Sequence, residues 1–398
     1  MSYAYKMSRR PGQRPAQQRR APNNRGGQYI HPSKFINKAS VEQIAEEVFT
    51  PTHSFSSMGL DERVVANLKA MGIEEPTSIQ DGSIPLIIEG KDLVGLANTG
   101  TGKTAAFLLP LIHRILKKEI YQVLVMAPTR ELAQQIEEEW RKFAQGLRLY
   151  SAICVGGTSM YNQIRSLQKD PHVVIGTPGR LKDLIEQGAL RLDKCDGLVL
   201  DEADRMLDMG FLPDIKFIMA KLPEVRQSLC FSATITPEIN RLIDGILKNP
   251  ETVSVRKGET ASHVDQDIIV AGTKEEKYDK LVELLKAPDF DKVLVFSQTK
   301  WGAQRLADTL TKDGHKAEAI HGNKTQSQRQ KALRSFKEGN VQVLVATDVA
   351  ARGLDISNVS HVINFDQPNT YQDYVHRIGR TGRAGKKGKA LTFVTHHP

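Results

Sequence analysis

Short apolar runs recur along the first half of the chain, and each is followed by a cluster of polar residues. The runs cover residues 92–97, 123–127, 173–175, 197–200 and 228–231. Because they are continuous rather than alternating, they indicate parallel strands that are buried on both faces. Helical spacing separates them, for example over 131–143 and 180–187, and also precedes them at 41–48 and 60–71. Strands that alternate with helices in this way predict a doubly wound α/β sheet.

A second series of apolar runs follows an interruption in the pattern. Residues 249–263 lack apolar periodicity, and we place a short linker at 256–263. The later runs cover residues 293–296, 317–320, 341–346, 361–365 and 389–394. The pattern therefore predicts two tandem domains, residues 41–255 and 264–398, each built on its own doubly wound parallel sheet.

The formal net charge of +9 belongs to the N-terminal segment. Residues 1–41 hold nine Lys and Arg residues and no acidic residue, which leaves 46 basic and 46 acidic side chains in the remainder. The segment is rich in Pro, Gln, Asn and Gly and lacks apolar periodicity, so residues 1–40 are predicted to be disordered. Pro11, Pro15 and Pro22 oppose the amphipathic helix of a mitochondrial presequence. A flexible Arg-rich arm is suited to binding nucleic-acid phosphates, and a solubilising tail is the alternative.

Composition and cysteine spacing narrow the classes of protein that fit. Hydrophobic residues make up 40% and charged residues 25% of the chain, as in globular proteins. No apolar run approaches the roughly 20 residues that span a bilayer, and no signal peptide is visible. Cys154, Cys195 and Cys230 show no C-x-x-C spacing, so we expect buried thiols rather than a zinc site or disulfides. A cytoplasmic location is expected, and a nuclear one stays open.

A Gly-rich turn between the first apolar run and a helical stretch carries the clearest chemical signal. It consists of Ala97, Asn98, Thr99, Gly100, Thr101, Gly102, Lys103 and Thr104. In a strand–turn–helix unit of this kind, backbone N–H groups point at phosphate oxygens. The lysine reaches the β- and γ-phosphates, and the threonine hydroxyl is placed to bind Mg²⁺.

Two other interpretations of this turn fit its residues less well. The same residues match the dinucleotide pattern G-x-G-x-x-A, but the acidic residue expected about 20 positions later is missing. A turn without a ligand would have no need of Gly-Lys-Thr. The sequence therefore predicts a site for a nucleoside triphosphate.

Two acidic residues follow the run at 197–200. Asp201 and Glu202 lie after a predicted buried strand, downstream of the phosphate loop, where phosphoryl-transfer enzymes hold Mg²⁺. We expect Asp201 to hold the metal, directly or through water, and Glu202 to orient and deprotonate the attacking water. One carboxylate, Thr104 and the phosphates suffice, because Mg²⁺ keeps several waters. The alternative is an acidic helix N-terminus with favourable dipole placement.

The second domain offers the positive charge that phosphoryl transfer requires. Arg380 and Arg383 lie in an Arg-rich segment, residues 374–383. An arginine at the γ-phosphate accelerates such reactions on the order of 10³–10⁵-fold. If both arginines reach across the cleft, the nucleotide joins the two domains; a solvated helix face is the alternative.

Gln80 leaves two interpretations open. Its amide can donate and accept, so it could read the N6/N7 edge of adenine. From spacing alone, a helix-capping role is favoured.

Together these and further motifs resemble the DEAD-box RNA helicases of superfamily 2, over roughly residues 53–398. The motifs occur in the family's order: Phe55 with Pro76-Thr77-x-x-Gln80, Ala97–Thr104, Pro128-Thr-Arg-Glu-Leu-Ala133, Gly156-Gly157, Thr177-Pro-Gly-Arg180, Asp201-Glu-Ala-Asp204, Ser232-Ala-Thr234, His321-Gly-x-x-x-Gln326-x-x-Arg329, Ala346–Asp355 and His376–Arg383. Asn98 departs from the Gln that is most common in the family. The resemblance implies two RecA-like domains that bind ATP and Mg²⁺ in their cleft, hydrolyse ATP, and unwind short RNA duplexes or remodel RNA–protein complexes.

The resemblance also implies roles for individual residues. Gln80 would select adenine with Phe55 stacked on the base, and Asp355 would hold the ribose. The residues that would couple hydrolysis to strand separation are Asp204, Ser232 and Thr234. RNA would lie across both domains, largely independent of sequence, on Pro128, Thr129, Arg130, Gly157, Thr177, Arg180, Gln326, Arg329 and Thr347.

Two other functions compete with this interpretation. An ATP-gated RNA clamp that serves as an assembly platform would use the same motifs. A DNA translocase is disfavoured, because the motif set resembles the RNA branch. The sequence ends at His396-His397-Pro398, so no C-terminal RNA-binding appendage is expected.

Overall fold

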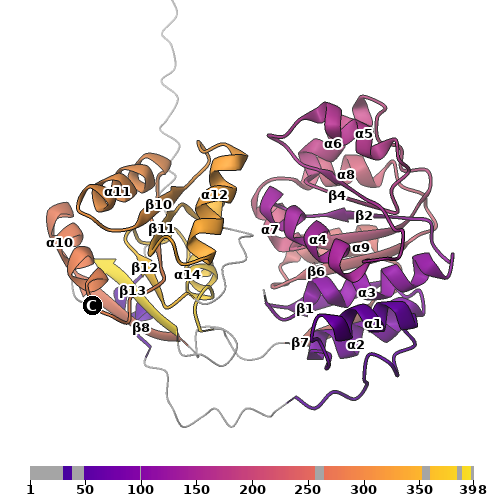
Figure 1. Cartoon of the computed structure of the whole chain (residues 1–398), viewed down its shortest axis with the longest axis horizontal. Coiled ribbons are helices and arrows are strands. Elements are labelled where there is room, and N and C mark those ends of the chain that lie inside the picture. The colour runs from indigo at the N-terminus through magenta and orange to yellow at the C-terminus, as the bar shows by residue number, and fades with distance from the viewer. Residues whose placement is uncertain are drawn as a thin grey trace, which may run out of the picture.

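The computed structural model describes residues 30–37, 49–98, 100–255, 264–351, 359–382 and 388–395. Within these residues the strands form two parallel sheets, one in each lobe of the molecule, with helices packed on them (Figure 1). The doubly wound α/β architecture predicted for both halves is therefore confirmed. The predicted linker at 256–263 and the predicted helix at 41–48 lie outside the described residues.

Seven parallel strands build the sheet of the first lobe, in the order β3-β4-β2-β5-β6-β1-β7. They are β1 Leu93–Ala97, β2 Gln122–Met126, β3 Ser151–Cys154, β4 Val173–Gly176, β5 Cys195–Asp201, β6 Gln227–Ser232 and β7 Glu251–Val255. Five of these strands correspond to the apolar runs. The two that were not predicted, β3 and β7, are the edges of the sheet, and neither is buried along its whole length. An edge strand needs no continuous apolar run, which is why β7 lies inside the stretch 249–263.

Helices cover both faces of this sheet. They are α1 Glu62–Ala70, α2 Ser78–Ile88, α3 Lys103–Leu116, α4 Arg130–Phe143, α5 Met160–Leu167, α6 Pro178–Glu186, α7 Ala203–Asp208, α8 Leu212–Met219 and α9 Pro237–Ile246. One hydrophobic cluster lies under α1 to α4, where the rings of Phe107 and Phe231 are 5.3 Å apart. A second lies on the opposite face under α6, α8 and α9 and includes Leu181 and Ile215.

Six parallel strands build the sheet of the second lobe, in the order β10-β11-β9-β12-β13-β8. They are β8 Val264–Val270, β9 Val293–Phe296, β10 Ala317–Ile320, β11 Val343–Ala346, β12 His361–Asn364 and β13 Gly388–Val394. The helices are α10 Lys274–Leu285, α11 Lys300–Lys312, α12 Gln326–Lys337, α13 Asp348–Ala351 and α14 Tyr371–Ile378. The strand that was not predicted, β8, is again an edge strand, with exposed side chains along it.

Residues 30–37 correct the prediction of a disordered tail over 1–40. A 3-10 helix, η1, spans Pro32–Phe35, and Asn37 forms an antiparallel bridge with Gln266 of β8. Phe35 is fully buried in the core of the second lobe. In Figure 1 this dark violet segment lies beside β8, away from α1 and α2 of similar colour. A single large apolar side chain has no periodicity in sequence, so only the complementary surface of the second lobe identifies it as ordered.

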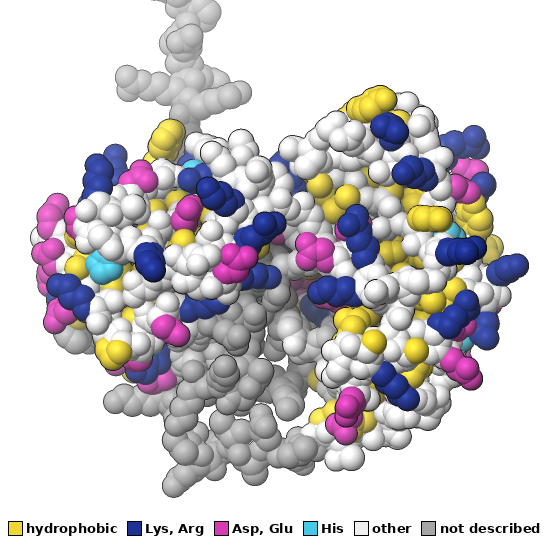
Figure 2. Space-filling model, in the orientation of Figure 1, with side chains coloured by type: hydrophobic (Ala, Val, Ile, Leu, Met, Phe, Trp, Pro, Cys, Tyr) yellow, Lys and Arg dark blue, Asp and Glu magenta, His cyan; other side chains and the backbone are white. Residues whose placement is uncertain are grey.

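The surface of the two lobes mixes charges of both signs. In the view of Figure 2, Lys and Arg side chains are spread over both lobes beside Asp and Glu, and they form no single basic patch. This distribution agrees with the equal numbers of basic and acidic residues after position 41.

The three cysteines are buried free thiols, as expected. Burial raises the pKa of each to about 12, so none carries a thiolate at neutral pH. Among the described residues, none of the helices combines the length and the hydrophobicity that a bilayer span requires.

His361 predicts a pH dependence of stability in the second lobe. The imidazole is 3% exposed and stacks on Phe290, with ring centroids 3.6 Å apart. Burial lowers its pKa to about 4, whereas an unfolded histidine takes up a proton near pH 6.5. The neutral His361 side chain therefore stabilises the fold fully above pH 6.5, and this stabilisation is lost as the pH falls toward 4. We expect the free energy of unfolding to decrease by roughly 1–3 kcal/mol over that range.

Thermal unfolding at pH 7.5 and pH 4.5 measures this effect. His361→Phe keeps the stacked ring and removes the titrating group, so the variant should lose less stability than the wild type between the two values. The same loss in both proteins would contradict the role given to His361.

Candidate functional site at the cleft between the lobes

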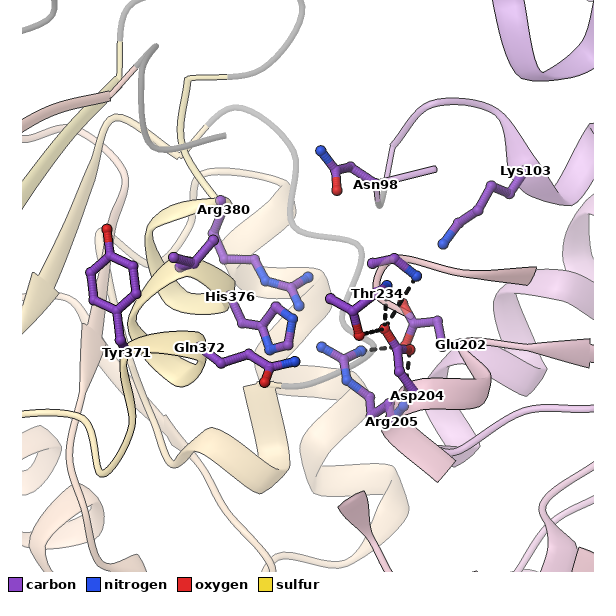
Figure 3. Close-up of a pocket in the computed structure, with 13 residues that line it drawn as sticks. Asn98, Lys103, Glu202, Asp204, Arg205, Thr234, Tyr371, Gln372, His376 and Arg380 are labelled. Carbon is purple, nitrogen blue, oxygen red and sulfur yellow. Dashed lines mark hydrogen bonds and ion pairs between the residues drawn. The ribbon is translucent and has the colours of Figure 1, made fainter. Parts of the chain in front are cut away.

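A cavity of about 300 Å³ lies where the strand ends of the first sheet face helix α14 of the second lobe (Figure 3). Both lobes contribute to its lining: Asn98, Lys103, Glu202, Asp204, Arg205, Ala233, Thr234, Tyr371, Gln372, Val375, His376, Gly379 and Arg380. The residues from the first lobe follow β1, β5 and β6, which are neighbours in the sheet. Because the carboxyl ends of parallel strands lie at one edge of the sheet, three segments distant in sequence form one wall.

The phosphate loop between β1 and α3 depends on glycine. Gly100 and Gly102 have φ angles of +86° and +91°, in the left-handed region that residues with a side chain rarely adopt. A Cβ atom on Gly102 would lie 2.4 Å from the amide nitrogen of Gln80. Glycine at this position therefore lets the loop close against α2 before α3 begins at Lys103.

Lys103, the first residue of α3, is 6% exposed and lines the cavity. Thr104 follows it in the first turn of α3. The Thr101 hydroxyl donates to the carbonyl oxygen of Asn98 at 2.8 Å and so tightens the turn. The predicted site residues that lie outside the described residues are Thr99, Asp355 and Arg383.

Gln80, in the first turn of α2, takes part in two hydrogen bonds. Its carbonyl oxygen accepts from the Thr77 N–H at 3.0 Å, as one half of a capping box. Its amide nitrogen donates to the Gly102 carbonyl at 3.1 Å. The helix-capping interpretation is therefore confirmed, and the second bond connects the cap to the phosphate loop. Each amide atom can make a further hydrogen bond, so adenine recognition stays a prediction.

Phe55 does not line the cavity in this conformation. It is 3% exposed and packs in the core cluster beneath α1. The segment before it is tied to α2, because the Asp81 carboxylate accepts from the N–H groups of Thr52 at 2.9 Å and His53 at 3.1 Å. Phe55 is thus anchored near Gln80, but its stacking on a base stays a prediction.

Strand β5 ends at the predicted metal ligand and the predicted base. Asp201 is 2% exposed, and burial raises the pKa of its carboxyl to about 6 against the opposing effect of the Lys103 charge. The backbone of Glu202 has φ 52° and ψ 52°, a left-handed conformation that costs a residue with a side chain on the order of 1–3 kcal/mol. This strained turn separates β5 from α7 and places Glu202 at the cavity wall.

Arg205 is a site residue that the sequence analysis missed. Its guanidinium forms an ion pair with Glu202, and both side chains are only 7% exposed (Figure 3). The two residues are three positions apart at the start of a helix, and that spacing is the sequence signal that could have identified the pair. The ion pair restrains the carboxylate that we expect to act as the base.

The expected connection between Asp204 and the segment Ser232–Thr234 is present (Figure 3). One carboxylate oxygen of Asp204 accepts from the hydroxyl and the N–H of Thr234, both at 2.9 Å, and from the Ala233 N–H at 3.2 Å. The Ser232 hydroxyl instead donates to the carbonyl oxygen of Thr234 at 2.8 Å. Thr234 rather than Ser232 therefore makes the side-chain contact that ties the end of β6 to α7.

Helix α14 brings the second lobe to the cavity. Arg380, just beyond the helix, is 3% exposed, and its side chain extends toward Thr234 and Glu202 (Figure 3). Arg377, one turn earlier, points into its own lobe and donates two hydrogen bonds to the Asp348 carboxylate, at 2.5 and 2.7 Å. This bidentate pair ties α14 to α13, and a hydrogen bond from Arg377 to the Asn364 side chain of β12 at 3.0 Å ties it to the sheet. Arg380 remains directed at the cleft (Figure 3).

A second cavity, of about 400 Å³, also receives residues from both lobes. Its lining includes six residues predicted to bind RNA: Pro128, Thr129, Arg130, Thr177, Arg180 and Arg329. Residues that were not predicted to bind RNA also line it: Glu131, Gly156, Gly179, Asp183, Met209, Phe211, Gly322, Lys324 and Val349. The predicted residue Gly157 has φ +72°, and a Cβ there would lie 2.0 Å from the Arg130 guanidinium. Gln326 and Thr347 are buried and are not part of this lining.

Two of the predicted RNA-binding residues bridge the lobes. Arg329 of α12 forms an ion pair with Glu131 of α4 at 3.1 Å, with side chains 13% and 5% exposed. Gln326 donates from its amide nitrogen to Glu131 at 3.1 Å and to Gln134 at 3.3 Å. These contacts hold α12 against α4, whereas contact of both residues with RNA stays a prediction.

Comparisons with known proteins agree with this geometry. The family model described as DEAD/DEAH box helicase matches residues 77–242, and the model described as helicase conserved C-terminal domain matches residues 276–385. The chain is 49% identical over 341 residues to the ATP-dependent RNA helicase CshA of Listeria monocytogenes, which is 85% of this chain and 66% of that protein. It is 47% identical over 343 residues to the DEAD-box ATP-dependent RNA helicase CshA of Geobacillus kaustophilus, which is 86% of this chain and 73% of that protein. The chain thus spans about two thirds of the length of the Listeria relative.

A solved structure extends the comparison to both lobes. The chain is similar to S. cerevisiae Dbp5 bound to RNA and ADP BeF3, with a TM-score of 0.77 and 32% sequence identity. The match covers 86% of this chain and 90% of the Dbp5 chain.

Replacing Gly102 with alanine should weaken nucleotide binding at least ~10-fold, or about 1.4 kcal/mol. The new Cβ would displace Gln80 and force a left-handed conformation on a residue with a side chain. Titration with a fluorescent ATP analogue measures the affinity. Gly59→Ala is the matched control, because Gly59 has φ +79° with nothing within 4 Å of its Cβ position. Equal affinity in the two variants would contradict the importance of the close approach at Gly102.

The Arg329–Glu131 ion pair predicts energetic coupling between the lobes. A double-mutant cycle of Arg329→Ala and Glu131→Ala tests this coupling. The measured quantity is the affinity for single-stranded RNA in the presence of a non-hydrolysable ATP analogue. We expect a coupling energy of about 0.5–3 kcal/mol. The exposed pair Arg241–Glu238 of α9 provides the control and should show almost no coupling. Strictly additive effects of the two buried substitutions would mean that the pair does not hold the lobes together.

Proposed function

The chain belongs to the DEAD-box family of ATP-dependent RNA helicases, and we propose that it hydrolyses ATP in the cleft between its lobes to unwind short RNA duplexes or remodel RNA–protein complexes. One observation carries the proposal: the phosphate loop of the first lobe and α14 of the second line the same cavity. A nucleotide held there would contact both lobes, so its γ-phosphate would decide whether the lobes stay together. Dbp5, bound to RNA and ADP BeF3, supports the pairing of these two ligands.

In this proposal the first lobe binds ATP before the chemistry begins. The N–H groups of the phosphate loop and the start of α3 bind phosphate oxygens, and Lys103 neutralises the β- and γ-phosphates. Gln80 uses its remaining hydrogen-bonding capacity on adenine, and its bond to Gly102 transmits the presence of the base to the loop. Lys103 is buried, so little water screens the attraction between its positive charge and the phosphates.

Asp201 at the end of β5 and Thr104 in the first turn of α3 offer donor atoms that suit Mg²⁺. The Asp201 carboxylate and the Thr104 hydroxyl are hard oxygen ligands of the kind that this ion prefers, and the raised pKa of Asp201 marks a buried carboxylate that a cation would stabilise. When bound, the ion would neutralise charge on the phosphates. Asp201 and Thr104 would hold it in place.

Hydrolysis requires a water molecule in line with the γ-phosphate. Glu202 accepts a proton from this water as its oxygen bonds to the γ-phosphorus, and the bond to the β–γ bridging oxygen breaks to release phosphate and ADP. Arg205 keeps the Glu202 carboxylate at the cavity wall. Arg380 stabilises the charge on the γ-phosphoryl oxygens from the opposite lobe.

The second cavity is where we place the RNA. Its basic members, including Arg130, Arg180 and Lys324, suit contacts with phosphates, and contacts to the backbone do not depend on base sequence. Because the lining comes from both lobes, RNA would bind tightly only while the lobes are closed. The bonds of Asp204 to Thr234 lie beside the nucleotide cavity, and we propose that they couple hydrolysis to RNA release. The cytoplasmic location stays a prediction.

Steady-state ATP hydrolysis with and without single-stranded RNA tests the proposal, with matched DNA and GTP as controls. We expect stimulation that requires RNA and adenine. Lys103→Ala and Glu202→Gln should each reduce the stimulated rate at least ~100-fold, because they remove phosphate neutralisation and the base. Lys117→Ala, at the exposed opposite end of α3, is the control for loss of a positive charge on the same helix. Full turnover in either site variant would show that the roles are wrong.

A further inference from the structure

The segment Ile30–Asn37 is built into the second lobe, although it precedes the first lobe in sequence. Asn37 and Gln266 exchange backbone hydrogen bonds at 3.0 and 2.8 Å, which adds a short antiparallel bridge to the free edge of β8. Ile30 and Phe35 belong to the hydrophobic cluster of the second lobe. We call residues 30–37 the N-terminal strap.

The strap contacts helix α14 through aromatic side chains. The Phe35 ring lies 4.8 Å from the ring of Tyr374, and both side chains are fully buried. The Tyr374 hydroxyl donates to the Gln266 side chain at 2.9 Å, so the same tyrosine also connects α14 to β8. Lys34 lies over the ring of Tyr371, 5.5 Å from its centroid.

Helix α14 therefore lies between the strap and the nucleotide cavity. Tyr374 and Tyr371 meet the strap, and Tyr371 also lines the cavity. Gln372 and His376 complete the side of α14 that lines the cavity, and Arg380 follows one turn later. In Figure 3 the Arg380 side chain extends into the cleft, whereas the Tyr371 ring lies farther from Glu202 and Thr234. The helix has 8 residues, too few to be stable without tertiary contacts, so its position depends on what packs against it.

We propose that the N-terminal strap is a positioning element for catalysis, in which Phe35 and Lys34 hold α14 so that Arg380 meets the γ-phosphate of the bound nucleotide. The inference rests on the proposed ATPase function. Arg377 anchors the helix through Asp348 of α13 and Asn364 of β12, and Phe35 supports it at Tyr374. A displacement of about 1 Å in a catalytic group lowers rates by on the order of 10²-fold, so loss of one support is measurable even when the domain stays folded.

The N-terminal segment would have two functions, RNA binding by residues 1–29 and positioning of α14 by the strap. A single deletion of both parts would not distinguish them. Residues 1–29 contain seven of the nine basic residues of the tail, and the strap follows them directly. Removing 1–29 should reduce RNA affinity and the dependence of that affinity on salt, because fewer phosphates are neutralised. Removing 1–37 should in addition lower the catalytic rate.

The test compares chains that lack residues 1–29 and 1–37, measuring kcat and KM for ATP at saturating single-stranded RNA. We expect the further removal of residues 30–37 to lower kcat about 10-fold or more with a smaller change in KM, because Arg380 acts mainly in the transition state. Phe35→Ala in the full chain should reproduce the loss, and Phe35→Met should restore most of it by refilling the buried site. Ile36→Ala is the matched control, since the Ile36 side chain is 40% exposed within the same segment.

A peptide of residues 28–40, added to the chain that lacks residues 1–37, distinguishes loss of the strap from misfolding of the shortened chain. The wild-type peptide should raise kcat, and the same peptide with Phe35→Ala should not. An unchanged kcat after removal of the strap, or failure of the wild-type peptide to raise it, would overturn the proposal. Absence of RNA-stimulated hydrolysis in the full chain would instead contradict the proposed function itself.

Discussion

Parallel pairing of strands is the constraint on which the whole site depends. In both sheets every strand runs in the same direction, so every carboxyl end, with the polar residues that follow it, lies at one edge. In the first lobe this places the phosphate loop, the Asp201–Asp204 segment and the Ser232–Thr234 segment on one wall. The second lobe presents α14 to that wall. Without the common direction of the strands, residues more than one hundred positions apart could not share a cavity of about 300 Å³.

The two carboxyl groups to which we assign the chemistry are held in unfavourable states. Asp201 is a buried carboxyl with a raised pKa, and Glu202 has a left-handed backbone. The structure compensates locally: Arg205 forms an ion pair with Glu202, and Asp204 accepts three hydrogen bonds from the end of β6. Strain and buried charge at a site are stable only when the surrounding contacts fix them. The same contacts make the site sensitive to ligands. A bound phosphate or cation would lower the electrostatic repulsion between the like charges that lie close together in the protein alone.

The second lobe contributes to the first cavity through one short helix, α14, and the residues that follow it. Contacts on several sides support this helix. Arg377 fixes α14 to Asp348 on the inner side, and the N-terminal strap covers Tyr371 and Tyr374 on another. The lobes themselves meet at Arg329 and Glu131, beside the second cavity. Nucleotide and RNA would therefore act on the same relative position of the lobes, the first through α14 and the second through α12 and α4. Linkage between the two ligands follows from this shared position.

The sequence alone determined the features that depend on local chemistry. Continuous apolar runs identified ten strands, the edge strand β10 among them. The motifs Gly-Lys-Thr and Asp201-Glu202 each identified one residue of the first cavity's wall, Lys103 and Glu202, because strand ends and phosphate loops have strict residue requirements. The tertiary structure decided what depends on contacts between distant segments. The edge strands β3, β7 and β8 lack a continuous apolar run because only pairing defines them, and Arg205 became significant only beside Glu202. The sequence likewise did not predict that residues 30–37 adopt a defined structure. Phe35 is buried by a surface that begins more than two hundred residues later in the chain.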